Sequence, residues 1–155
     1  MKANELMIKD WVAINKPDRY AGATGQIHSL MYHQEGDSAY FHVFIQGKYG
    51  YLTRDVCSDD IRPIPLTPEI LEKNGYRRIK GGKVMGLHVA DIFDLEISNE
   101  YGRYLKIDLQ DFGETEATHW YIGIQGRFSF SGYIGYLHQL QHIYRLCGVE
   151  KNIEL

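Results

Sequence analysis

Turn-forming residues interrupt the first 65 positions so often that no helical period lasts for more than one turn. The interruptions fall at Pro17, Gly22, Gly25, Gly36, Gly47 and Gly50. The runs between them are rich in β-branched and aromatic residues, which is typical of strands. The expected strands are residues 7–14, 26–32, 39–46, 48–53 and 56–64. Because so short an antiparallel sheet avoids exposed edges by closing on itself, this segment predicts a small β-barrel.

A complete set of helix signals follows the predicted barrel. Thr67 is suited to the N-cap, Pro68 to the first helical position and Glu69 to the positive end of the helix, while Gly75 ends it. The sequence therefore predicts a two-turn helix. A helix this short does not persist alone, so we expect it to pack at the junction between the two halves of the chain.

The second half of the chain alternates apolar and polar residues at period two. Residues 93–98 and 105–109 predict an antiparallel hairpin, with residues 84–90 as a neighbouring strand and residues 118–124 as the strand that follows. Residues 133–147 then predict an amphipathic helix that ends at Gly148. The expected architecture is α+β: a barrel domain over residues 1–66, and over residues 67–155 an antiparallel sheet packed by a C-terminal helix.

The polar face of that helix carries the one spacing typical of a metal site. His138 and His142 stand four residues apart, which lets two imidazoles reach one zinc ion, but a catalytic version needs an acid where Gln139 stands. Arg145 shares the face and opposes a cation. The favoured interpretation is a solvated helix face with no metal, and a metal-dependent, hydrolase-like enzyme is an alternative.

Composition excludes several classes of protein. A net charge of −3 provides no global attraction to nucleic acid or to an anionic membrane, whereas twelve tyrosines favour strands or a binding face. The N-terminus is too short in apolar residues for a signal peptide, and no stretch reaches the length of a membrane span. Cys57 and Cys147 form no paired motif. We therefore expect a cytoplasmic protein with no membrane partner.

Two stretches of the chain look familiar. Residues 137–150 and 63–71 resemble a family of uncharacterised proteins of Bacteroides-type gut bacteria and their mobile elements. That resemblance implies a bacterial or phage source and a cytoplasmic location, and it supplies no catalytic residue. Residues 8–12 followed by residues 22–27 are similar to the start of small barrels of the KOW or Src-homology-3-like type. Such barrels frequently bind RNA or ribosomal partners, although this chain lacks their strongly basic composition.

Two segments combine cations with features of a binding surface. In the first, strand aromatics alternate with cations, as on surfaces that stack bases; its residues are Lys48, Tyr49, Tyr51 and Arg54. The second is the densest cationic run, with a glycine pair inside it; its cations are Arg77, Arg78, Lys80 and Lys83. The favoured interpretation of the first segment is a hairpin whose tyrosines pack across strands, and that of the second is a solvated hairpin.

Signatures of catalysis are missing from the sequence. The glycine pairs do not match a phosphate loop or a dinucleotide fingerprint, and no nucleophile elbow is present, so we expect no cofactor. The acids are interpreted as ordinary surface charges; they include Asp59, Asp60, Asp91 and Asp94. The sequence favours a non-catalytic binding module that contacts nucleic acid or protein through aromatic strand faces, and a homo-oligomeric structural protein is a further alternative.

Overall fold

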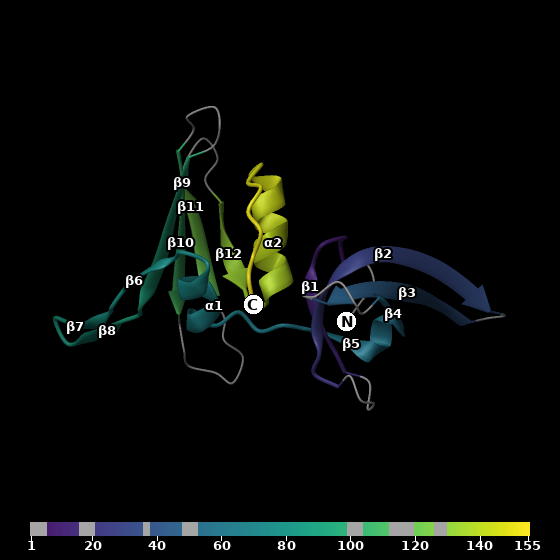
Figure 1. Ribbon diagram of the computed structural model, residues 1–155. Coiled ribbons are helices and arrows are strands. Elements are labelled where there is room, and N and C mark those ends of the chain that lie inside the picture. Colours follow the sequence, from purple (N-terminus) through teal and green to yellow (C-terminus); the bar gives the residue numbers. More distant parts are fainter. Residues whose placement is uncertain are drawn as a thin grey trace. The chain divides into compact units, whose positions relative to one another are not determined.

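The computed structural model describes residues 6–15, 21–35, 38–47, 53–98, 104–111, 120–125 and 130–155. The chain divides into two compact units, Met1–Ile64 and Pro65–Leu155. Both are shown in Figure 1. Each unit is built around its own antiparallel five-stranded sheet.

The described residues of the first unit form five strands and one 3-10 helix. They are β1 (Trp11–Ile14), β2 (Thr24–Glu35), β3 (Ser38–Gly47), β4 (Thr53–Cys57), η2 (Ser58–Asp60) and β5 (Ile61–Pro63). Two expected strands are shorter than predicted. Lys9 has a φ of 71°, so residues 7–10 form a turn in front of β1. Ser58–Asp60 adopts η2, which divides the expected 56–64 strand into β4 and β5.

The sheet of the first unit is strongly curled. Its strand order is β4-β3-β2-β1-β5, so β4 and β5 form its two edges. In a flat sheet these edges would lie about 19 Å apart, at about 4.8 Å per strand spacing. The three residues of η2 join them, and a 3-10 helix of this length spans only about 8 Å. The sheet must therefore curl around its apolar side.

The core of the first unit is formed by residues of β1, β2, β3 and β5, together with Leu6. Its buried residues are Leu6, Val12, Ile14, Ile27, Ile45 and Ile61. Among the described residues, no ladder joins β4 to β5. The structure thus shows a curled antiparallel sheet, and the closed barrel expected from the sequence is not found.

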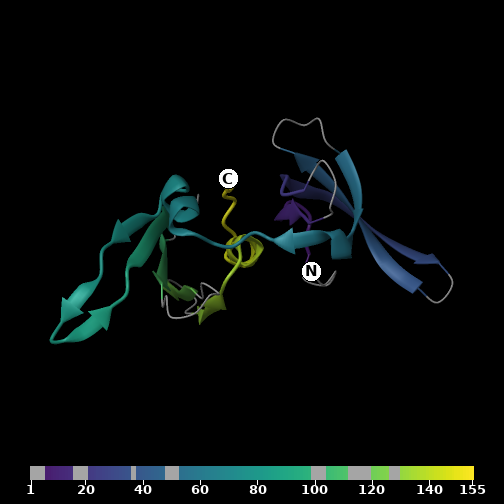
Figure 2. The ribbon, with the colours of Figure 1, turned by 90° about the horizontal axis from the view of Figure 1, so that it is seen from below.

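In the second unit, the residues that the structure describes form seven strands and two helices. They are α1 (Pro68–Lys73), β6 (Arg77–Ile79), β7 (Gly82–Val84), β8 (Leu87–Val89), β9 (Ile92–Ser98), β10 (Tyr104–Asp111), β11 (Trp120–Gln125), β12 (Phe130–Ile134) and α2 (Leu137–Leu146). The five-stranded sheet has the order β12-β11-β10-β9-β6, and β7 pairs only with β8. Helices α1 and α2 lie on one side of the sheet in both views (Figures 1 and 2). This arrangement confirms the α+β class.

Buried hydrogen bonds fasten the helical layer to the sheet. The Trp120 indole nitrogen donates to the Leu66 carbonyl at 2.8 Å, and the Trp120 ring meets Phe93 edge-on at 5.3 Å between centroids. The Tyr76 and Tyr144 hydroxyls lie 2.7 Å apart in the interior. Helix α1 therefore packs within the second unit, between the loop that carries Leu66 and strand β9.

Helix α1 begins and ends where the sequence predicts. The Thr67 side chain accepts a hydrogen bond from the Ile70 amide at 3.4 Å, which satisfies one of the open N–H groups of the first turn. At the other end, Gly75 has a φ of +83°, a conformation that favours glycine. The local signals were sufficient here because each acts within one turn of the helix.

Helix α2 begins later than predicted. Residues 130–134 form β12, and α2 starts at Leu137. The Gln139 side chain fixes this start, since its Oε1 accepts hydrogen bonds from the amides of Gly135 (2.8 Å) and Tyr136 (3.1 Å). Tyr133, expected on the apolar helix face, is instead an exposed strand residue. The prediction of the helix was right, and its first turn was wrong.

The expected strand at residues 84–90 is also wrong. Met85 and Gly86 have φ values of 51° and 82°, so the chain reverses there in a two-residue turn. Strands β7 and β8 lie on either side of that turn. The strand that pairs with β9 on the side away from β10 is β6, in place of the expected residues 84–90. Strand β6 carries part of the cationic run.

Candidate functional site

Strands β6 to β9 form one long hairpin, called here the 77–94 hairpin. Arg77 is paired with Asp94 in the β6–β9 ladder, and Val84 is paired with Leu87 in the β7–β8 ladder. The residue numbers of every pair in both ladders add up to the same value, so the register does not change between them. The inner half belongs to the sheet. The outer half, residues 82–89, is a separate two-stranded ribbon that extends past the sheet (Figure 1).

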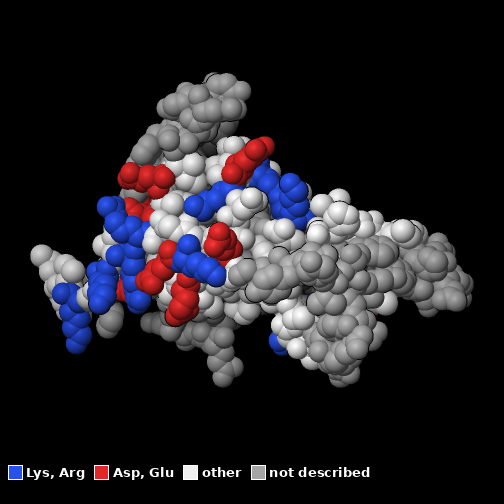
Figure 3. Space-filling view, viewed as in Figure 1, with Lys and Arg blue, Asp and Glu red and all other residues white. Residues whose placement is uncertain are grey.

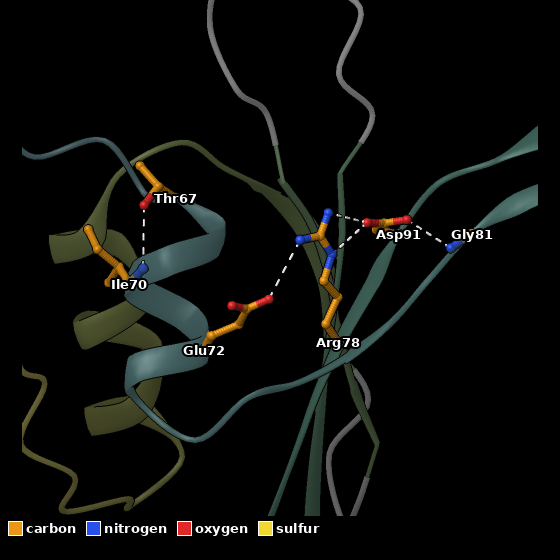
Figure 4. Close-up of polar contacts among 6 residues, drawn as sticks. All are labelled: Thr67, Ile70, Glu72, Arg78, Gly81 and Asp91. Carbon is orange, nitrogen blue, oxygen red and sulfur yellow. Dashed lines mark hydrogen bonds and ion pairs between the residues drawn. The ribbon is translucent and has the colours of Figure 1, made fainter.

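A polar cluster fixes the point where the outer half leaves the sheet (Figure 4). Arg78 donates from Nε to Asp91 Oδ2 at 2.7 Å, and its Nη2 forms an ion pair with the same oxygen at 2.6 Å. The other oxygen, Oδ1, accepts the Gly81 amide at 2.8 Å. Arg78 Nη1 also lies 3.6 Å from Glu72 Oε1 on α1. These contacts connect the hairpin to the helix beside it.

The contacts of Asp91 favour its charged form. The hydrogen bond from the Gly81 amide contributes most to lowering the pKa of this carboxyl, and the hydrogen bond from Arg78 comes next. The Arg78 guanidinium also lies 5.4 Å from the centroid of the Phe93 ring. Arg78 is therefore held between an anion and an aromatic face.

Gly81 is required at the base of the outer half because the two strands approach closely there. A Cβ atom at this position would lie 2.0 Å from the Val89 carbonyl oxygen and 2.6 Å from the Ala90 carbonyl carbon. Both contacts are with backbone, which cannot move aside without separating the strands. The neighbouring Gly82 has open space around the same position.

The second arginine of the run is also paired with an acid. Arg77 donates from Nε and Nη2 to the two carboxylate oxygens of Asp94, at 3.0 and 2.5 Å. Asp94 is only 3% exposed, so its interpretation as an ordinary surface charge is wrong. The reason is the register, which places Arg77 directly opposite it. Basic and acidic side chains are correspondingly interleaved over this part of the second unit (Figure 3).

The outer half of the hairpin exposes apolar side chains. Val84 is 59% exposed, Met85 99%, Leu87 73% and Val89 39%. Strand alternation places Val84, Leu87 and Val89 on one side of the ribbon, and Lys83 lies on the other. Val84, Leu87 and Val89, with Met85 at the turn, are called here the hairpin apolar surface. The predicted site residues Lys80 and Lys83 are exposed beside it.

Met85 occupies a position that disfavours it. Two-residue hairpin turns of this kind need positive φ at both central residues, so asparagine, aspartate and glycine are preferred there. A methionine with a φ of 51° is a backbone outlier for its residue type. Because its side chain is almost fully exposed, packing within the described residues does not account for it.

A second exposed feature lies on the face of the sheet that turns away from the helices. One residue from each strand stands in register across it: Ile79, Ile92, Gln110, Tyr121 and Tyr133. The Tyr121 and Tyr133 rings meet edge-on at 5.4 Å, and Tyr133 is 66% exposed. This is an aromatic strand face of the type that the composition favours.

The histidine pair does not lie on a solvated face. His138 is 4% exposed, so that part of the interpretation is wrong. The Tyr136 ring stacks on it at 5.9 Å, and the His142 ring meets it edge-on at 5.6 Å. A helical projection places His138 on the solvent side of α2. In the structure its ring is covered by the stacked ring of Tyr136, the N-cap residue of the helix. Within the described residues, no group of three histidines, cysteines or acids is placed to hold a metal ion.

The other predicted segment falls largely outside the described residues. Lys48, Tyr49 and Tyr51 are not among them. Arg54 lies in β4, opposite Ile45, and its side chain is not described. Sequence reasoning did not find the hairpin apolar surface. The sequence does contain a signal for it, because the apolar residues Val84 and Leu87 stand at symmetric positions on either side of residues 85–86, as in a two-residue hairpin.

In the part of the chain that the structure describes, neither helix is long and apolar enough to cross a bilayer. Comparison with protein-family models, with curated proteins and with solved structures finds no match to this chain.

Proposed function

We propose that this chain is a non-catalytic binding module whose partner is another protein and whose main contact element is the 77–94 hairpin. The observation that carries the proposal is the hairpin apolar surface, above all Met85 at 99% exposure. Exposed apolar side chains that gather on a protruding element are typical of protein–protein contacts. A two-stranded ribbon is also only marginally stable alone in water, so it gains from a partner that covers it.

Charge favours a protein over a nucleic acid. Arg77 and Arg78 are exposed but form ion pairs with Asp94 and Asp91, whereas within the described residues neither Lys80 nor Lys83 forms an ion pair. Two lysines neutralise about two phosphates, whereas salt-dependent nucleic-acid binders typically neutralise about six to ten. The electrostatic contribution of this hairpin to nucleic-acid binding is therefore small.

The aromatic face of the sheet supports the same function. The Tyr121–Tyr133 pair and the row that ends at Ile79 form a second exposed surface, and its Ile79 and Ile92 belong to the base of the hairpin. Tyrosine is enriched at interfaces because its ring provides contact area while its hydroxyl stays solvated. We propose that this row extends the contact made by the hairpin.

For the first unit we propose a small barrel of the KOW or Src-homology-3-like type. The support is the strand order together with the three-residue link between the edge strands β4 and β5. A cytoplasmic location belongs to the same proposal. Cys57 and Cys147 are both thiols, which suits a reducing compartment.

The test compares two matched variants. Leu87→Ser removes a 73% exposed side chain from the hairpin, and Leu146→Ser removes an 87% exposed one from the end of α2. Each immobilised protein is incubated with nuclease-treated lysate of the source cells. Every enriched protein is then purified and its Kd measured. We expect Leu87→Ser to raise the Kd at least tenfold and Leu146→Ser to leave it unchanged. Equal affinity for both variants, or binding only to nucleic acid in a shift assay at varied salt, contradicts the proposal.

A further inference from the structure

We infer that the hairpin takes up an extended, acidic peptide segment of its partner, which adds as a strand beside β6 and β7 and covers the hairpin apolar surface. This inference rests on the proposed function and names the chemistry of the partner. Strand addition to an open sheet edge is a general mode of peptide recognition, in which main-chain hydrogen bonds provide affinity and alternate side chains provide specificity.

The edge that the peptide needs is present. Strand β6 is the last strand of its sheet, and β7 continues it in the same register along the hairpin. Residues 77–84 thus offer one edge about 26 Å long, at about 3.3 Å per residue. No proline interrupts it. Among the described strands, none pairs with the outer side of β6 or β7.

The side chains along this edge define what kind of strand fits. Residues 80–90 contain Lys80 and Lys83 and no acid, in a chain whose net charge is −3. Val84, Leu87 and Val89 form the apolar side of the ribbon, and Lys83 lies on the other side. A complementary strand has apolar residues at alternate positions, for the side of Val84, and aspartate or glutamate between them, for the side of Lys83. At the base of the hairpin the unchanged register places Lys80 on the side of Val84, so an acid replaces the apolar residue there.

The same lysines exclude a second copy of this edge as the occupant. Pairing of two identical edges would bring Lys80 and Lys83 of one copy against the like charges of the other, which is destabilising. Edge lysines of this kind are a common protection against self-pairing. An acidic strand is instead attracted by Lys80 and Lys83. The charge pattern therefore favours an acidic partner over a second copy of this edge.

The hairpin is held ready for such a contact. Asp91 binds both Arg78 and the Gly81 amide at the base, and Arg78 reaches Glu72 on α1. Little ordering of the hairpin base is therefore needed on binding. At the tip, Met85 tolerates an unfavourable φ while its side chain stays available for the end of the peptide.

The experiment uses the full chain and a library of random dodecapeptides displayed on phage. Selection on the wild-type protein is preceded by removal of phage that bind the support alone. We expect the enriched sequences to alternate apolar residues with aspartate or glutamate. An enriched peptide is then synthesised with a fluorophore, and its Kd is measured by anisotropy.

Variants separate the contributions of the hairpin. We expect the Kd of the peptide to rise at least tenfold with Leu87→Ser and with the Lys80→Glu, Lys83→Glu pair, and to be unchanged with Leu146→Ser. Circular dichroism of each variant checks that it is folded. These substitutions replace exposed side chains, so the fold of the second unit is retained.

Backbone methylation of the peptide tests strand addition itself. N-methyl groups on alternate amides block ladder hydrogen bonds in one phase and point to solvent in the other. We expect one methylated peptide to lose binding and the other to keep it. Equal effects of the two phases, or enriched peptides without acids, overturn the inference and leave the proposed function standing. Enriched peptides and purified partners that are all indifferent to Leu87→Ser overturn both.

Discussion

Asp91 binds the guanidinium of Arg78 through a single carboxylate oxygen, Oδ2, which accepts a hydrogen bond from Nε and forms an ion pair with Nη2. This leaves Oδ1 for the backbone amide of Gly81. The two residues are diagonal neighbours in the hairpin, since Arg78 is paired with Phe93 and Asp91 lies two positions before it. One carboxylate thus joins the sheet edge, the ribbon and, through Arg78, helix α1 (Figure 4).

The ribbon is predicted to lose order as acid neutralises Asp91. The folded pKa of this carboxyl is lowered, chiefly by the Gly81 amide and then by Arg78. Its contribution is therefore fully present above the unfolded pKa, near 4, and is lost as the pH falls through the lower folded value. In hydrogen-exchange NMR the protection of the Gly81 amide, relative to the intrinsic exchange rate at each pH, should decrease below about pH 4. In Asp91→Asn this dependence should be absent, and its persistence there would assign the effect to another group.

Gly81→Ala is predicted to destabilise the second unit by about 1–3 kcal/mol, the usual cost of forcing extra atoms into a close contact. The added Cβ would meet the Val89 carbonyl oxygen at 2.0 Å. Gly82→Ala is the matched control, because its Cβ meets nothing within 4 Å. Urea denaturation of the two variants measures the difference. A free energy of unfolding that is equal in both would show that the strands separate there without cost.

Thr67→Ala is predicted to lower the free energy of unfolding by about 1 kcal/mol, as is typical for the loss of an N-cap side chain. The Thr67 hydroxyl accepts the Ile70 amide at the start of α1. Thr67→Ser keeps this oxygen and should retain most of the stability. If thermal unfolding ranks Ser with Ala, the cap contributes nothing and the methyl group of Thr67 is what matters.

The parts of the fold that the sequence predicts are those decided within a few residues. Helix α1 follows from Thr67, Pro68 and Gly75, and the β9–β10 hairpin follows from period-two alternation. The start of α2 depends instead on Gln139 reaching back to the amides of Gly135 and Tyr136. Residue type alone does not distinguish that cap from an exposed polar side chain.

The candidate site was predictable in part for the same reason. The cations Arg77, Arg78, Lys80 and Lys83 are recognisable as a run in the sequence. Which of them are paired depends on the register of the hairpin, and the register depends on a turn at Met85 and Gly86. Methionine is a poor indicator of such a turn. Without knowledge of that turn, the sequence does not reveal that Arg77 pairs with Asp94 or that Val84 and Leu87 lie on the same side of the ribbon.

Removing the hydroxyls of Tyr76 and Tyr144 is predicted to have strongly coupled effects on the free energy of unfolding. The two oxygens lie 2.7 Å apart, and the residues are 4% and 1% exposed. Tyr76→Phe or Tyr144→Phe leaves one hydroxyl without this partner, which should lower the free energy of unfolding, measured by urea denaturation, by about 1–3 kcal/mol. The double variant removes both hydroxyls, so its loss should be smaller than the sum of the two single losses.

The same pair makes a prediction at alkaline pH. Burial raises the pKa of both phenols above the ordinary value near 10. A raised folded pKa means that stability is intact below the unfolded value and falls as the pH passes above about 10. Urea denaturation at pH 7 and pH 11 should therefore show a larger decrease for the wild type than for the double phenylalanine variant. An equal decrease in the two proteins would show that the hydroxyls remain accessible to hydroxide in the folded state.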